Sequence, residues 1–101
     1  MALRYWAYIF LSPGFNRDEH QVTMESSQTR MKAIGIDMDK KEEVIEIAKQ
    51  LVEDGVQMIE LCGGFGPNWV AKVSEAIHYV VPIGTVMYGP EARKPMLEIL
   101  S

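Results

Sequence analysis

An abrupt change from an apolar run to a glycine-rich turn, at residues 59–68, constrains the fold of this chain more than any other feature. The segment reads Ile-Glu-Leu-Cys-Gly-Gly-Phe-Gly-Pro-Asn. The apolar run has strand character, and Pro67 suits the first position of a helix, where its missing N–H is not needed. A strand that passes directly into a helix is typical of α/β proteins, which tend to bind ligands at the carboxyl ends of their strands.

The same alternation of strand and helix patterns continues along most of the chain. Apolar runs typical of strands cover residues 5–11, 31–38, 56–62 and 83–88. Apolar residues at helical spacing follow each of the last three runs. The strands from residue 31 onward are therefore expected to be parallel, because helices connect them.

Residues that begin and end helices support this interpretation. Asp39 is predicted to be the N-cap of the first helix, with Glu42 completing a capping box, and Gly55 is predicted to end that helix. The chain closes with a predicted helix at residues 91–100. This last helix is expected to bury its apolar residues, which are Ala92, Met96, Leu97 and Leu100.

Residues 12–30 form a polar segment that is long for a connection inside a compact domain. Two interpretations are open: a short helix at residues 17–23, or a mobile flap. Because this segment can return the chain to either end of the sheet, the direction of the first strand is undetermined.

These patterns predict one α/β domain over residues 1–101. The domain should contain an open, mostly parallel sheet of four strands and about three helices, in the order β-β-α-β-α-β-α. Such a sheet is flavodoxin-like, or resembles half of a barrel. Its two edges have little to protect them from pairing with another chain, so we expect a homo-oligomer.

Charge and composition exclude several classes of partner. The net charge is −4, and no cluster of basic residues is denser than Lys40-Lys41, so nucleic-acid binding is not expected. The apolar N-terminal run is too short to span a membrane. The single cysteine forms no internal disulfide, and no targeting segment is recognised, so the expected location is the cytoplasm.

The glycine-rich turn is the first candidate site. Backbone N–H groups of Gly63, Gly64 and Gly66 can bind an anion where the helix begins. Two neighbours, Phe65 and Asn68, belong to the same turn, and a second strand-to-helix junction at Tyr88 could wall the same crevice. The alternative is a purely structural turn that needs positive φ.

Cys62 is the candidate nucleophile, because it lies at the end of a strand beside the start of a helix. The base it needs could be His20, since His78 lies at the far end of the second helix, about 15 Å from the start of that helix. A Cys62–His20 pair is thus the one nucleophile–base pairing that the sequence offers. The alternative is a buried thiol that packs as a small apolar group.

Glu60 shares a strand face with Cys62, because strand side chains alternate. A carboxylate among apolar residues is either a general base or a member of an ion pair. The candidate partners for an ion pair are Arg4, Arg17 and Arg30.

No motif for a cofactor or a metal is recognised. The glycines match neither the dinucleotide fingerprint G-x-G-x-x-G nor the P-loop, which needs Lys-Ser/Thr after its glycines. Asp37 and Asp39 could together hold a cation, but a role in a cap and a turn explains both. We therefore expect no cofactor and no metal.

Several segments together resemble an uncharacterised family of prokaryotic proteins of about 100 residues, described only as a domain of unknown function. The resemblance spans nearly the full chain and includes Glu-Leu-Cys-Gly-Gly-Phe-Gly-Pro at residues 60–67 and Tyr-Gly-Pro-Glu at residues 88–91. It implies no activity. A weaker likeness is to strand–helix units of phosphate-binding (β/α) barrels, and this is an analogy at the level of fold.

Two functions are compatible with these observations. The first is a small α/β protein that binds an anionic metabolite at the carboxyl ends of its strands and that could be a small enzyme using Cys62, Glu60 and His20. The second is an oligomeric interaction or scaffold protein with no small-molecule site.

Overall fold

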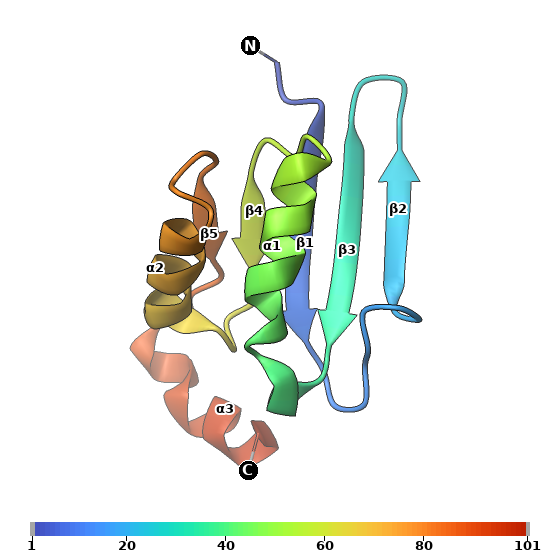
Figure 1. Ribbon diagram of the computed structural model, residues 1–101. Coiled ribbons are helices and arrows are strands. Elements are labelled where there is room, and N and C mark those ends of the chain that lie inside the picture. Colours follow the sequence, from blue (N-terminus) through green and yellow to red (C-terminus); the bar gives the residue numbers. More distant parts are fainter. Residues whose placement is uncertain (1, 101) are drawn as a thin grey trace.

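A five-stranded sheet with two helices packed on one face forms the body of the protein (Figure 1). The computed structural model describes residues 2–100. In chain order, the elements are β1 (Tyr5–Leu11), β2 (Gln21–Glu25), β3 (Arg30–Ile36), α1 (Glu43–Glu53), β4 (Ile59–Leu61), α2 (Gly66–Ala76), β5 (Ile83–Thr85) and α3 (Arg93–Leu100). Short 3-10 helices, η1 (Met38–Lys40) and η2 (Pro90–Ala92), precede α1 and α3.

The sheet is mixed but mostly parallel, as predicted. Its strand order is β2-β3-β1-β4-β5. β1 runs parallel to both of its neighbours, β3 and β4, which settles the direction of the first strand, and β5 is parallel to β4. Only β2 is antiparallel, and it pairs with β3 at the edge of the sheet.

β2 is the strand that the sequence analysis missed, so the sheet has five strands rather than four. Neither interpretation of this segment, a helix at residues 17–23 or a flap, is right. Residues 17–19 form a turn in which Asn16 Oδ1 accepts hydrogen bonds from the N–H groups of Asp18 and Glu19. The chain then pairs with β3 from Gln21 onward. Every residue of β2 is exposed, so no run of buried side chains marked it.

The core lies between the sheet and the two helices α1 and α2. Both helices cover the same face of the sheet in Figure 1. In β1 the buried residues alternate, as expected for a strand with one covered face. The largest fully buried side chains come from β1, β3, β4 and both helices: Ile9, Ile36, Val44, Leu51, Ile59, Leu61 and Val73.

The start of α1 differs from the prediction and its end agrees. Asp39 is not its N-cap; instead Asp37 accepts a hydrogen bond from the Asp39 N–H at 3.1 Å and begins η1. Asp39 lies within η1, and Glu42 is the N-cap residue of α1, so the predicted capping box does not form. At the other end, Gly55 has φ +94° and its N–H donates to the Val52 carbonyl, as expected for a glycine that ends a helix.

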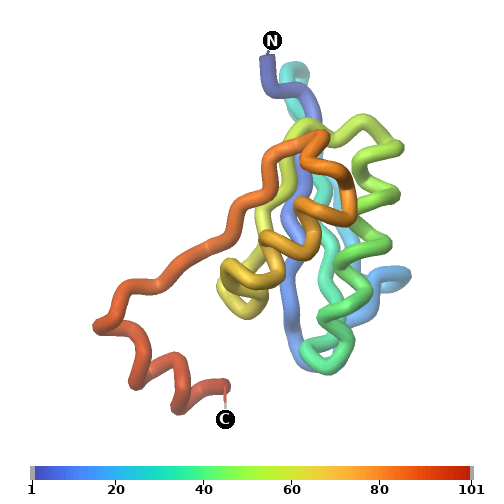
Figure 2. The backbone as a smooth tube through the Cα atoms, turned by 60° about the vertical axis from the view of Figure 1, so that its left-hand side comes forward, coloured from blue at the N-terminus to red at the C-terminus, as the bar shows by residue number. Residues whose placement is uncertain are grey.

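α3 was expected to bury an apolar face, and this prediction is wrong. No residue of α3 is buried, and the side chain of Leu97 is 62% exposed. Figure 2 shows why: an extended arm after β5 carries α3 away from the sheet, and the helix lies beside the body rather than on it. None of the helices in residues 2–100 has the length and apolar character needed to cross a lipid bilayer.

Candidate functional site

The carboxyl ends of β1 and β4 form the point where the chain changes direction across the sheet. These two parallel strands are neighbours. After β1 the chain turns toward β2 at one edge, and after β4 it turns into α2 and then β5 at the other edge (Figure 1). Divergent connections leave a crevice between the strand ends, and this is where open α/β sheets bind ligands.

A cavity of about 460 Å³ lies at this crevice. Its floor is formed by Leu11 at the end of β1 and by the turn of Cys62, Gly63 and Gly64 after β4. The segment after β5 also lines it, with Tyr88 from the extended arm and with Met96 and Leu100 from α3. We call this cavity the β1–β4 pocket.

The glycine turn lines the β1–β4 pocket, and two of its backbone donors are unpaired. The Cys62 N–H donates to the Ile9 carbonyl, and the Phe65 N–H donates to the Cys62 carbonyl. Within residues 2–100, the N–H groups of Gly63 and Gly64 have no hydrogen-bond acceptor. Unpaired amides beside a cavity are suitable donors for an anion, and anion binding at this turn stays a prediction.

Close packing around the turn leaves little room for a side chain at two of its glycines. A Cβ on Gly63 would lie 2.9 Å from the Tyr88 ring, and a Cβ on Gly64 would lie 3.0 Å from Leu11 Cδ1. The arm and the end of β1 therefore approach the bare backbone directly. Gly66 differs, because its φ of +73° is what starts α2, and a Cβ there would meet open space.

The remaining residues of the predicted binding set are divided between core and surface. Phe65 is buried, and its ring packs edge-on against Trp69 at 6.3 Å between centroids, so it anchors α2. Asn68 is exposed in the first turn of α2 and does not line the β1–β4 pocket. Tyr88 does line it, and it also borders a second hollow of about 640 Å³ between the arm and the start of α2, where Gly66 lies.

Cys62 and Glu60 gather around a residue that the sequence analysis did not single out, Tyr8. Glu60 pairs with Tyr8 in the β1–β4 register, and Cys62 Sγ accepts a hydrogen bond from the Leu11 N–H at 3.3 Å. Burial raises the pKa of the Tyr8 phenol, and the negative charges that Cys62, Tyr88 and Glu60 can carry raise it further. Three ionisable groups thus lie within electrostatic range of Tyr8.

Tyr8 was missed because its role depends on which strand lies beside β1. Alternation along β4 is local, so the sequence could place Glu60 and Cys62 on one face. The pairing of Tyr8 with Glu60 joins residues far apart in the chain. The one sequence signal was the hydroxyl of Tyr8 within an aromatic strand. A hydroxyl at this position does not indicate that Glu60 is its neighbour.

His20 does not approach Cys62 as a base. Its Nδ1 accepts a hydrogen bond from the Asn16 N–H at 2.9 Å, and its ring lies 4.5 Å from the Phe15 ring. It lies outside the β1–β4 pocket. His20 therefore stabilises the turn before β2, and the predicted nucleophile–base pair is not assembled.

Glu60 forms none of the ion pairs considered for it. Arg17 pairs with Glu46 at 3.7 Å, and Arg30 lies over the Tyr5 ring at 4.0 Å from its centroid. Within residues 2–100, no ion pair involves Glu60. Glu60 is instead exposed on the face of the sheet that α1 and α2 leave uncovered.

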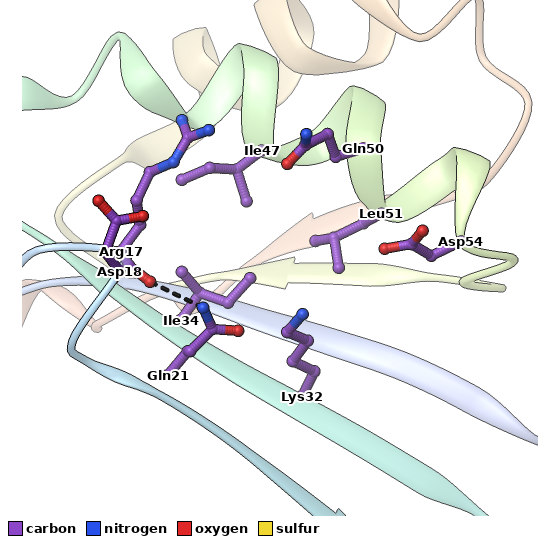
Figure 3. A pocket seen from close by; sticks show the side chains of 9 residues that line it. All are labelled: Arg17, Asp18, Gln21, Lys32, Ile34, Ile47, Gln50, Leu51 and Asp54. Atoms are coloured by element: carbon purple, nitrogen blue, oxygen red, sulfur yellow. Dashed lines mark hydrogen bonds between the residues drawn. The ribbon is translucent and has the colours of Figure 1, made fainter.

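A separate polar pocket lies between α1 and the β2–β3 edge (Figure 3). It has a volume of about 270 Å³, and Gln21 crosses its mouth by donating from Nε2 to the Arg17 carbonyl at 3.0 Å. Two cations and two carboxylates line it, so it offers no net charge to a ligand: Arg17, Lys32, Asp18 and Asp54. No pattern in the sequence indicates this pocket, because Gln21, which begins β2, forms part of its lining.

The described residues offer no ready metal site. In residues 2–100, no three His, Cys, Asp or Glu side chains come together in a way that could hold a metal ion. Asp37 and Asp39 belong to the turn into η1, where Asp37 accepts the Asp39 N–H.

Comparisons with known proteins give a family but no activity. Neither the curated proteins nor the solved structures include a match. Residues 4–101 match a family of unknown function, DUF6506, which covers the glycine turn, the arm and α3. The chain therefore belongs to this family of unknown function, as the resemblance over nearly its whole length suggested.

Proposed function

We propose that the protein binds a small metabolite with one anionic group and an apolar body in the β1–β4 pocket. The observation that carries this proposal is the pair of unbonded N–H groups, of Gly63 and Gly64, beside a cavity at the carboxyl ends of β1 and β4. An anion such as a carboxylate or a phosphate would accept from these amides, near the N-terminus of α2.

The walls of the pocket indicate that the ligand has an apolar part in addition to its anionic group. Leu11 on one side and Met96 and Leu100 on the other are apolar, so a fully polar ligand would leave this surface unused. A short hydrocarbon chain attached to the anionic group would cover this apolar surface. Each buried CH₂ contributes about 0.8 kcal/mol, so several carbons would add measurably to the affinity.

Calorimetry with a simple probe tests this proposal. Hexyl phosphate should bind and raise the thermal midpoint, whereas inorganic phosphate and hexanol, each carrying only half of the recognised chemistry, should bind more weakly. If hexyl phosphate and hexanoate both fail to bind and to stabilise the protein at millimolar concentration, the proposal is wrong.

A matched pair of glycine variants locates the site. Gly64→Ala places a methyl group 3.0 Å from Leu11 Cδ1, at the mouth of the amide turn, and should weaken hexyl phosphate binding about tenfold, or about 1.4 kcal/mol. Gly84→Ala in β5 is the control, because a Cβ there has no atom within 4 Å. Equal affinities of the two variants would show that the ligand binds elsewhere.

The proposal is compatible with catalysis in which Cys62 is the nucleophile. The nearby acid–base groups would be Glu60 and Tyr8 instead of His20. Glu60 pairs with Tyr8 in register, and Cys62 is partly accessible at the pocket floor. Such an enzyme would act on the bound metabolite through the thiol.

A second candidate function is that of a self-associating interaction protein without a small-molecule site. It is favoured by α3, an amphipathic helix that buries none of its residues in one chain. Multi-angle light scattering tests it directly: a monomer at micromolar concentration would remove its support.

A further inference from the structure

We infer that the uncovered face of the sheet is the interface with a second copy of this chain, and that a two-fold axis crosses β1 at Trp6. This inference rests on the self-association proposed above and adds the surface and the geometry. It makes no use of the β1–β4 pocket.

The uncovered face is apolar where a surface would normally be polar. In β1, Tyr5, Ala7 and Ile9 point into the core, so the alternate residues Trp6, Tyr8 and Phe10 point to the opposite face. Their neighbours in register on β3 and β2 are also largely apolar, and Val22 and Met24 are 54% and 58% exposed. Aromatic residues and methionine are the types enriched in interfaces.

No described element of this chain covers that face. Parallel strands are normally covered on both sides, but α1 and α2 lie on one side and α3 stands away from the sheet (Figures 1 and 2). Phe15 covers only the carboxyl end, where its ring packs on Phe10 at 5.6 Å and a Cβ on Gly35 would clash with both rings. Tyr88 of the arm also lies within electrostatic range of Tyr8, so the part of the face toward the amino ends of the strands is what remains open to a partner.

The size of the face suits a protein partner. With about 3.3 Å per residue and about 4.8 Å between strands, five strands of these lengths have a footprint on the order of 400 Å². The accessible area of a corrugated surface exceeds its footprint. The footprint alone is about half of the roughly 800 Å² that each partner contributes to a stable interface, and it is more than a small ligand would cover.

The charges on this face match those of a second copy. Among the strand positions on this side, Glu60 is the one carboxylate, whereas Glu25, Arg30 and Lys32 alternate to the other side. Arg4, just before β1, is paired through its backbone to Arg30 and to the Gln57 side chain, so alternation assigns its side chain to the uncovered face. Neither Arg4 nor Glu60 has an ion-pair partner within residues 2–100.

The positions of these two charges define the axis. Arg4 precedes Trp6 by two residues, and Glu60 is in register with Tyr8, which follows Trp6 by two residues. A two-fold axis through Trp6, across the strands, therefore places each Arg4 beside the partner copy's Glu60 and forms two equivalent ion pairs. Such a self-complementary contact is what a two-fold interface requires.

The same axis runs along one row of the sheet. Trp6 is in register with Met31, and Met31 is in register with Met24. In the dimer this row of side chains meets its own copy, so each Met24 faces the partner copy's Met24. A cation at this position would face an identical cation.

The experiment compares Met24→Lys with Thr23→Lys by analytical ultracentrifugation of the full chain. Wild type should sediment as a dimer, with twice the 11.4 kDa of one chain. Met24→Lys should weaken the dimer at least tenfold. Thr23→Lys, at the neighbouring exposed position on the opposite face, should leave it unchanged, and circular dichroism should show both variants folded. A monomeric wild type would overturn both self-association and this interface.

A charge exchange tests the axis separately. Arg4→Glu and Glu60→Arg should each weaken the dimer, because each sets like charges together, and the double variant should recover most of the lost affinity. A dimer that tolerates Met24→Lys would overturn the face but keep self-association. A double variant that is no better than the single variants would overturn the axis. Hexyl phosphate binding is measured separately on the wild-type protein, so the failure of the interface and the failure of the proposed function can be told apart.

Discussion

At the scale of single residues, Tyr8 connects the pocket with the uncovered face. Its ring belongs to the aromatic row of β1 and stacks 5.9 Å from Phe10. Its hydroxyl lies within electrostatic range of Cys62 and Tyr88, which line the β1–β4 pocket. A substitution at Tyr8 should therefore affect both the β1–β4 pocket and the uncovered face.

The raised pKa of Tyr8 predicts a loss of stability in alkali. The phenol ionises at a higher pH in the folded chain than in the unfolded chain, whose value is 10.0. The folded chain therefore retains its proton longer, and the free energy of unfolding should be full below pH 10.0 and fall as the pH rises through the folded pKa.

Tyr8→Phe should reduce this alkaline loss, measured by urea unfolding at fixed protein concentration between about pH 9 and pH 11. Some loss should remain, because burial also raises the pKa of Tyr5. Tyr79→Phe is the control, since that side chain is 72% exposed. If Tyr8→Phe and wild type lose stability in parallel, the environment assigned to Tyr8 is wrong.

Cys62 should report on occupancy of the β1–β4 pocket. Cys62 lines the pocket and is half-buried, so iodoacetamide should alkylate it in the native protein. Hexyl phosphate should slow this alkylation in proportion to the fraction of protein bound, followed by mass spectrometry, whereas hexanol should slow it less. Unchanged alkylation at saturating ligand would separate the ligand site from the thiol.

At the scale of elements, the helices α1, α2 and α3 were predictable from the sequence, but whether each of them packs on the sheet was not. The spacing of Val44, Ile47, Ala48 and Leu51 in α1 reflects burial against the sheet, and all four are buried. The same kind of pattern in α3 reflects a surface that this chain leaves exposed. Periodicity shows that a helix has an apolar face, but it does not show which molecule covers that face.

β2 shows the opposite failure. It is held by backbone pairing with β3 while all of its side chains are exposed, so its alternation of Val22 and Met24 with polar residues was too short to stand out. The site was predictable to a similar degree. The glycine turn and the shared face of Glu60 and Cys62 are local properties, whereas the positions of His20 and Tyr8 depend on packing between distant segments.

Gly55 and Gly84 distinguish the effect of a positive φ from the effect of limited room for a side chain. A Cβ on Gly55 or on Gly84 would have no atom within 4 Å, but only Gly55 has positive φ, at +94°. Gly55→Ala should lower the free energy of unfolding by about 1–2 kcal/mol, and Gly84→Ala should change it by less than about 0.5 kcal/mol. Thermal and urea unfolding measure both, and equal losses would refute the account of how α1 ends.

At the scale of the whole molecule, the arm makes the protein longer than its core. The extents are 40 × 27 × 24 Å, and the radius of gyration is 14.0 Å, against about 13 Å for a compact domain of this size. The body is a two-layer sheet and helix unit, and the arm with α3 extends beyond it (Figure 2).

Removing residues 90–101 should therefore leave the fold of the body intact. Because α3 buries none of its residues, the free energy of unfolding should change by less than about 1 kcal/mol. The apolar wall formed by Met96 and Leu100 would be lost, so hexyl phosphate should lose much of its advantage over inorganic phosphate in the shortened protein. Urea unfolding and calorimetry measure the two effects, and cooperative unfolding lost on truncation would show that α3 belongs to the core.

In the proposed function, the position of α3 separates the residues that would recognise the tail of a ligand from those that keep the protein folded. One wall of the β1–β4 pocket comes from a helix without a single buried residue, while the other comes from the sheet. Substitutions at Met96 or Leu100 can reshape the cavity with little effect on the core. Related chains can thus acquire different preferences for the tail of a ligand and still meet its head group with the same two amides.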